Sequence, residues 1–137
     1  MTDEKLIGAV IDELYDAISG PKGARDWSRQ KNSFLPRARL IRTWADEEGR
    51  AEMMIMSLEE YAQITTPFFA ANAFYDVETA RRFDIFGNIA HVWSHYEART
   101  SPSDEEVERR GINSIQLFRD PDQGWRIIHM IWDNERD

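Results

Sequence analysis

The chain has 137 residues, a formal net charge of −8 at pH 7 and no cysteine. The acidic balance argues against a nucleic-acid partner, because nucleic acids are bound by basic surfaces. The lack of cysteine excludes disulfides, thiol nucleophiles and zinc–thiolate sites. Hydrophobic residues make up 42% of the chain, so we expect a packed core and a single domain over residues 1–137.

Targeting and membrane segments are not expected either. No apolar run approaches the roughly 20 residues of a membrane-spanning helix. The first residues, MTDEKLIGAVIDEL, are too acidic for a signal peptide. We therefore expect a cytoplasmic protein without a membrane partner.

The first part of the chain shows two helical segments. Thr2 can cap a helix whose apolar residues recur at helical spacing as far as Ile18. A second, short helix is predicted to start at Asp26, with Trp27 inside its first turn.

A hairpin and a third helix follow. Strands are predicted over residues 37–45 and 50–56, on either side of an acidic turn. Ser57 and Glu60 fit a capping box at the start of the next helix. Pro67 is predicted to bend or end that helix, because proline lacks the backbone N–H that a helix interior uses.

The second half of the chain is predicted to be mainly β-structure. Gly87-Asn88 suits a two-residue hairpin turn, and residues 120–124 supply turn chemistry for a closing hairpin. The highly charged residues 101–110 are predicted to form a mobile or weakly helical loop. Four stretches rich in β-branched and aromatic residues are predicted strands: 73–86, 89–100, 112–118 and 125–132.

This order of elements resembles a bacterial branch of the nuclear-transport-factor-2-like superfamily over nearly the whole chain. The similarity is strongest in LYDAISGPKGARDW, FGNIAHVWSHYE, GINSIQL and GWRIIHMIWDNE. The resemblance implies an α+β fold of the cystatin-like roll type. In such a fold a strongly bent, mostly antiparallel sheet forms a cone, and the N-terminal helices close a pocket.

What the resemblance implies for function is broader, since one fold can carry many activities. The scaffold hosts ketosteroid isomerases, dehydratases, SnoaL-like cyclases, hydrolases and binding proteins. Our first hypothesis is a pocket that binds an apolar or carbonyl-bearing small molecule without turnover. The second is a cofactor-free lyase, isomerase or polyketide-cyclase-like enzyme, and the third is a structural or interaction domain. A homodimer formed through the outer sheet face is expected, and neither a metal nor an organic cofactor is.

One candidate catalytic pair comes from the predicted hairpin register. If Phe86 faces Ile89 across the turn, Asp84 lies opposite His91. An aspartate beside a histidine can hold the imidazole tautomer and raise its basicity, as proton transfer requires. The alternative is a structural ion pair or a polar dimer surface, which is the commoner use of such pairs. Asp84 is the one mid-strand aspartate that we expect in this region.

The remaining candidates surround the expected pocket. His129 lies in an apolar strand, so it is expected to be buried or to line a cavity, and catalytic and structural roles both stay open. Ketosteroid isomerases use a helix tyrosine to donate a hydrogen bond to the substrate oxygen, and the resemblance implies that Tyr15 could act in this way. Asn113 is a candidate donor to a ligand carbonyl, and Trp27 and Trp93 are candidate aromatic lining.

Overall fold

The computed structural model describes residues 1–103 and 107–136, and it has the expected α+β architecture. A six-stranded sheet in the order β2-β1-β6-β5-β4-β3 is parallel between β1 and β6 and antiparallel elsewhere. The sheet does not close into a barrel. The elements are α1 (Asp3–Ile18), the 3-10 helix η1 (Trp27–Asn32), β1 (Phe34–Ala45), β2 (Ala51–Met56), α2 (Leu58–Ala71), β3 (Tyr75–Phe86), β4 (Ile89–Arg99), β5 (Val107–Asp120) and β6 (Gly124–Asn134).

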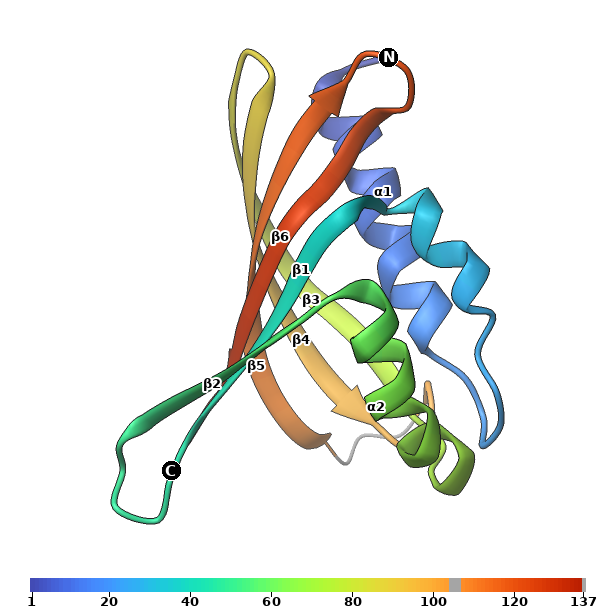
Figure 1. Ribbon diagram of the computed structural model, residues 1–137, viewed down its shortest axis with the longest axis vertical. Helices are drawn as coiled ribbons and strands as arrows, with labels where there is room; N and C mark the ends of the chain where they lie inside the picture. Colours follow the sequence, from blue (N-terminus) through green and yellow to red (C-terminus); the bar gives the residue numbers. More distant parts are fainter. Residues whose placement is uncertain (104–106, 137) are drawn as a thin grey trace.

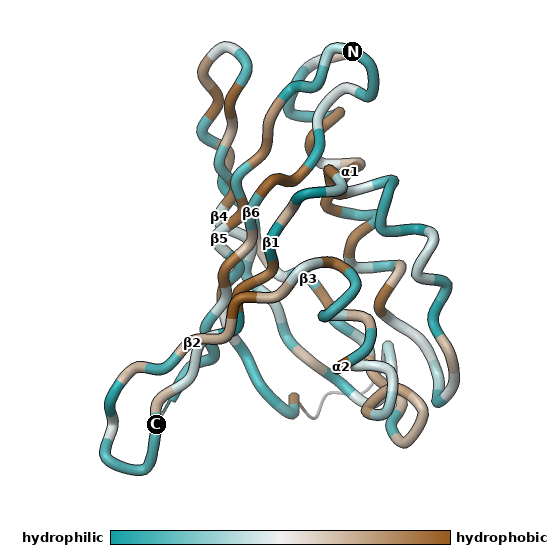
Figure 2. The backbone as a smooth tube through the Cα atoms, viewed as in Figure 1, coloured by the Kyte–Doolittle hydropathy of each residue, from teal (hydrophilic) through white to brown (hydrophobic). Residues whose placement is uncertain are grey.

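The helices all lie on one side of the strongly twisted sheet (Figure 1). We call the sheet face toward the helices the inner face and the opposite one the outer face. The β1–β2 hairpin projects away from the rest of the sheet, and its tip is hydrophilic (Figure 2). No helix among the described residues is long and apolar enough to cross a membrane.

Helix α1 forms the side of the core that faces the sheet. The Thr2 hydroxyl accepts a hydrogen bond from the Lys5 backbone N–H at 3.2 Å and so caps the helix as predicted. The apolar stripe of α1, including Ile7, Ile11 and Leu14, is buried against the inner face of the sheet. Burying each such side chain contributes about 1.5–3 kcal/mol, so this packing fixes α1 against the sheet.

Helix α2 begins as predicted and ends later than predicted. Ser57 and Glu60 form the reciprocal capping box, with both hydrogen bonds present. Of the two outcomes predicted for Pro67, an end of the helix is wrong, since α2 continues through this residue to Ala71. Phe69, two residues after Pro67 in the same helix, is only 3% exposed. Its burial offsets much of the roughly 3 kcal/mol that a proline inside a helix costs.

The boundaries of two other elements also differ from prediction. The short helix is a 3-10 helix over Trp27–Asn32 with Asp26 as its N-cap, so the predicted start at Asp26 holds to within one residue. The predicted loop over residues 101–110 is partly strand, because β5 already begins at Val107. Glu97 on β4 accepts hydrogen bonds from Arg99 and Arg110, which ties this charged part of β5 to the sheet. Residues 104–106 of the predicted loop lie outside the described residues.

A β-bulge in β3 decides which of its side chains face inward. Glu78 pairs with Tyr96 but Ala80 pairs with His95, so Thr79 is an extra residue in β3. A single extra residue reverses the side-chain alternation beyond it. Asp76 and Glu78 therefore share the inner face with odd-numbered residues after the bulge, such as Arg81.

A second irregularity has the same effect in β6. Gln116 pairs with His129 while Leu117 pairs with Ile127, which leaves Ile128 as the extra residue. Trp125 and Ile127 before this bulge are buried on the inner face. After the bulge the even-numbered Met130 and Trp132 point inward, so His129 is on the outer face.

Candidate functional site

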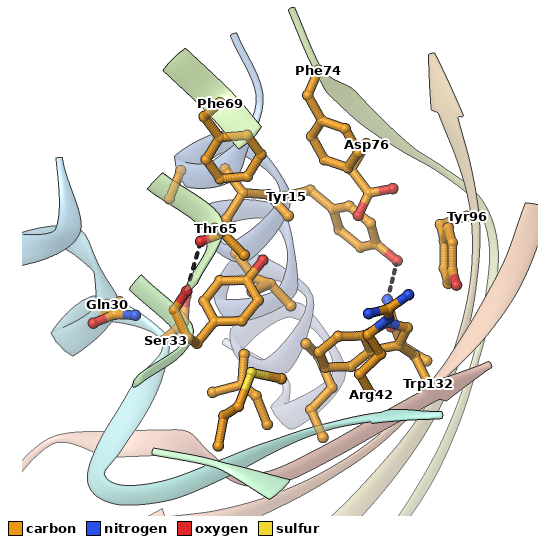
Figure 3. Close-up of a pocket in the computed structure, with 18 of the residues that line it drawn as sticks. Tyr15, Gln30, Ser33, Arg42, Thr65, Phe69, Phe74, Asp76, Tyr96 and Trp132 are labelled. Atoms are coloured by element: carbon orange, nitrogen blue, oxygen red, sulfur yellow. Dashed lines mark hydrogen bonds between the residues drawn. The ribbon is translucent and has the colours of Figure 1, made fainter. Parts of the chain in front are cut away.

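A cavity of about 400 Å³ lies between the helices and the inner face of the sheet (Figure 3). This volume is within the range of small-molecule sites. The described side chains therefore leave space inside the cone. Aromatic and aliphatic residues make up most of the wall, among them Leu14, Trp27, Tyr61, Phe69, Phe74 and Trp132.

An aspartate and an arginine also line this largely apolar cavity. Asp76 on β3 and Arg109 on β5 are each paired with Ala98 on the intervening strand β4. Ala98 is buried and has the smallest side chain that could stand there apart from glycine. Asp76 and Arg109 therefore face the cavity on either side of the small Ala98 side chain.

The Asp76 carboxyl is in an unusual environment for an acid. It points into the cavity near Tyr15 and Phe74 (Figure 3), and its Oδ1 atom is buried without a hydrogen-bond partner among the described residues. Burial raises the pKa of Asp76 to about 7, against the opposing effect of the positive charge of Arg109. Near neutral pH this group can both accept and release a proton.

A buried chain of hydrogen bonds fixes the orientation of Tyr15. Ser94 donates its hydroxyl proton to Glu78 Oε2 at 2.6 Å, so at its 2.6 Å contact with Tyr15 it can only accept. Tyr15 therefore donates to Ser94 and, in turn, accepts from Asn113 Nδ2 at 3.0 Å. Burial is the main cause that raises the pKa of Tyr15, so the phenol stays neutral.

The far end of this chain is anchored by charge. Arg81 donates to Glu78 and also to Asp12 of α1, the latter at 2.6 Å. The chain thus runs from the cavity wall to the surface of α1. Both Tyr15 and Asn113 line the cavity, and the second N–H of the Asn113 amide is not used in its hydrogen bond to Tyr15.

Three of the four predicted ligand-binding residues line the cavity. Tyr15, Trp27 and Asn113 are in its wall, although the proton of Tyr15 is used by Ser94 and does not point at a ligand. Trp93 is on the outer face and is 38% exposed, so the structure does not bring it to the cavity. Its odd number places it on the outward side of β4, whose even-numbered residues are buried.

The predicted catalytic residues are together, but away from the cavity. Asp84 is opposite His91, as the turn register predicted, and the pairing continues across the sheet to Gln116, His129 and Arg39. This row is on the outer face, and none of its members lines the cavity. The bulge at Ile128 is what places His129 there.

His91 also has a different partner from the predicted one. Its Nε2 atom is 2.9 Å from the Ser114 hydroxyl. Desolvation lowers the pKa of His91, and the nearby charge of Asp84 opposes this effect. Asp84 and His91 are therefore cross-strand neighbours on the outer face. Asp84 influences His91 through its charge, and no hydrogen bond joins the two among the described residues.

The sequence pattern does not identify the acid and the cations of the cavity. The expectation that Asp84 is the one mid-strand aspartate of this region is wrong, because Asp76 is also within β3. Strict alternation from the Gly87-Asn88 turn places Asp76 on the same face as Asp84, and only the bulge at Thr79 separates them. In the sequence Arg42 is one charged residue of a predicted strand and Arg109 is one of a predicted loop, and neither pattern indicates a cavity.

Comparisons with protein-family models and with curated proteins give no match. Solved structures do match at high coverage. An NTF2-like superfamily protein from Salmonella enterica has 18% identity and a TM-score of 0.68, over 98% of this chain and 92% of that chain.

Two further solved structures carry provisional enzyme names. A provisional ketosteroid isomerase from Shewanella frigidimarina is 19% identical, with a TM-score of 0.64 over 96% of this chain and 97% of that chain. A provisional dehydratase of the NTF2-like family from Streptomyces avermitilis is 14% identical, with a TM-score of 0.68 over 98% and 97%. These likenesses and the bent sheet with its helices on one face show that the chain has the cystatin-like fold of NTF2-like proteins.

Proposed function

We propose that the protein binds an apolar, carbonyl-bearing small molecule in the cone cavity and acts on it as a cofactor-free isomerase or lyase. Asp76 carries this proposal, because it is the acid that an apolar cavity holds close to half-ionised at neutral pH. The provisional names of two structural neighbours, a ketosteroid isomerase and a dehydratase, belong to the same reaction class.

The proposed chemistry is proton transfer next to a carbonyl. The ionised Asp76 carboxylate takes a proton from the carbon beside the carbonyl, and the electrons of that C–H bond move to the carbonyl oxygen as an enolate. Asp76, now protonated, returns the proton to another carbon, or protonates a leaving hydroxyl that departs as water. Negative charge on the oxygen needs hydrogen-bond donors in the cavity.

Two groups are placed to donate to that oxygen. Asn113 has a second N–H that is not used by Tyr15. Tyr61 lines the cavity, and its hydroxyl has no hydrogen-bond partner among the described residues. Burial and the charge of Asp76 raise the pKa of Tyr61, so it keeps its proton available for donation.

Proton exchange tests this proposal directly. We expect the protein to accelerate exchange of the α-protons of 2-tetralone, an apolar bicyclic ketone, with D2O as followed by NMR. Asp76→Asn should reduce the rate by about 10²–10⁴-fold, while the control Asp84→Asn on the outer face should leave it unchanged. If 2-tetralone binds but the wild type does not accelerate its exchange, the protein is a binding protein without this chemistry. If Asp76→Asn accelerates exchange as much as the wild type, Asp76 is not the base.

The second candidate, binding without turnover, is favoured by one observation. Tyr15 and Asn113 are held by a complete hydrogen-bond chain, and such a rigid polar wall suits recognition as well as catalysis. In that case the Asp76→Asn variant would change affinity alone. Calorimetry on both proteins separates a change of affinity from a change of rate.

The outer face of the sheet is our proposed homodimer surface. Trp93, Phe118 and Ile128 are 38%, 38% and 37% exposed in the single chain and stand on that face, beside the polar row that includes His91. Apolar side chains surrounded by polar ones are typical of protein interfaces. Light scattering should give a dimer mass for the wild type and a monomer mass for Trp93→Glu.

A further inference from the structure

Two arginines line the cavity without ion-pair partners. Arg42 is opposite Trp132 on the inner face, and Arg109 is opposite Ala98. Both line the cavity and both are solvent-exposed, so they stand where the cavity meets the solvent. Within residues 1–103 and 107–136, neither guanidinium forms a salt bridge.

Other arginines of this acidic chain are paired with its own carboxylates. The chain has 25 acidic residues for 17 basic ones. Arg29, Arg81, Arg99 and Arg110 each have a carboxylate oxygen within 2.9 Å. Arg42 makes only a ring contact, with its guanidinium carbon 5.1 Å from the Trp44 ring centre. The two cavity arginines have no salt-bridge partner among the described residues, so the carboxylate of a ligand can pair with them.

The rest of the cavity wall indicates the chemical character of the ligand body. Beneath the arginines the cavity is bounded by aromatic and aliphatic side chains, including Trp27, Phe69 and Trp132. We infer that the cavity takes apolar carboxylates, whose anionic group is held by Arg42 and Arg109 while the apolar body lies among the aromatic residues. This inference rests on the proposed function and names the substrate class of the same site.

A carboxylate fits this arrangement better than a phosphate. A guanidinium matches the two oxygens of a carboxylate with two parallel hydrogen bonds. Asp76 is in the same cross-strand row as Arg109, and an ionised Asp76 repels a dianion more strongly than a monoanion. The site should therefore prefer a ligand with a single negative charge.

Binding of such a ligand should be coupled to proton uptake by Asp76. The groups that face Asp76 are Tyr15 from α1, Tyr61 from α2, Tyr96 from β4 and Arg109 from β5. The pKa values of the three tyrosines are raised, mainly by burial, so around neutral pH Arg109 is the charged member. A ligand carboxylate that neutralises Arg109 removes the charge that holds the pKa of Asp76 down, so the pKa of Asp76 rises and its ionised form, the base of the proposed reaction, is regained at higher pH.

The experiment uses a matched pair of probes with the full chain. One probe is 1-naphthylacetate and the other is the neutral 1-naphthylacetamide, and binding is measured by calorimetry and by the fluorescence of Trp27 and Trp132. At pH 6.5 we expect the carboxylate to bind at least tenfold tighter than the amide. The affinity for the carboxylate should fall between pH 6.5 and pH 8.5, and that for the amide should not.

Variants identify the residues responsible. Arg42→Gln and Arg109→Gln should each weaken 1-naphthylacetate at least fivefold and change 1-naphthylacetamide less than twofold. Arg37→Gln is the matched control, because this exposed arginine of β1 does not line the cavity and its loss changes the net charge equally. It should leave both affinities within twofold of the wild type.

Each outcome has a definite meaning. If the acid and the amide bind equally tightly, or if the cavity arginine variants weaken both alike, the carboxylate inference is overturned while the proposed cavity function stands. If neither probe binds at millimolar concentration but 2-tetralone exchange is catalysed, the inference also fails. If neither probe binds and no exchange occurs, both proposals fail.

Discussion

Asp76 and Arg109 face one cavity from β3 and β5, with the small side chain of Ala98 between them. Burial raises the pKa of the Asp76 carboxyl to about 7, while the charge of Arg109 acts to lower it. Burying the charged form of this acid costs stability near neutral pH. The same near half-ionised group is useful for proton transfer.

Removing the Asp76 charge should therefore stabilise the fold at higher pH. The folded-state pKa of about 7 is above the ordinary value of 3.8, so the stability of the wild type falls as the pH rises from about 4 to about 7. At about 1.4 kcal/mol per pH unit, the full effect is at most about 4 kcal/mol. Asp76→Asn should be more stable than the wild type at pH 8, and the gain should shrink at pH 5.

Urea unfolding at the two pH values measures this difference. Asp84→Asn is the control, because this aspartate is exposed on the same strand and should show no comparable pH-dependent gain. A gain for Asp76→Asn that is equal at pH 5 and pH 8 would contradict a raised pKa in the folded protein.

Gly111 should not tolerate a methyl group. A Cβ built on Gly111 would be 2.3 Å from both the Tyr96 hydroxyl and the Asp133 backbone oxygen. The Asp133 atom is a backbone oxygen, and the Tyr96 hydroxyl is hydrogen-bonded to Asn134. Neither neighbour can therefore move away freely. We expect Gly111→Ala to lower the free energy of unfolding by about 1–3 kcal/mol.

Gly20→Ala is the matched control for that substitution. The nearest atom to its added Cβ is 3.6 Å away, on the flexible Arg25 side chain. Thermal unfolding should show a clearly lower midpoint for Gly111→Ala than for Gly20→Ala. Equal midpoints would show that Tyr96 can be displaced from its place over Gly111.

The Tyr15–Ser94 hydrogen bond should be measurable by a double-mutant cycle. Ser94 is fully buried, so Ser94→Ala leaves the Tyr15 hydroxyl without its acceptor and should cost about 1–3 kcal/mol. Tyr15→Phe should then cost less in the Ser94→Ala background than in the wild type, with a coupling of about 0.5–3 kcal/mol. Additive effects would mean that Tyr15 donates elsewhere.

Histidine substitutions should not affect chemistry in the cavity. His91 and His129 are in the polar row on the outer face and do not line the cavity. We expect His91→Ala and His129→Ala to leave the rate of 2-tetralone exchange within twofold of the wild type. A loss of exchange in either variant, with the fold intact by circular dichroism, would make the outer face part of the active unit.

Local features were predictable from the sequence because they depend on neighbouring residues. The Ser57–Glu60 capping box and the pairing of Asp84 with His91 across the Gly87-Asn88 turn are both set by spacings of a few residues. The order of helices and strands, and hence the α+β fold, follows from patterns of the same short range. Pro67 marks the limit, because the burial of a residue beyond it outweighs its local preference.

Patterns between neighbouring residues fix the helices and strands, their turns and the supply of aromatic side chains for a cavity. Which acid faces that cavity depends on how the strands pair. The bulges at Thr79 and Ile128 each shift one residue, which brings Asp76 inward and turns His129 outward. A bulge is a compromise between neighbouring strands of a bent sheet, so the position of each side chain depends on strands that are far away along the chain.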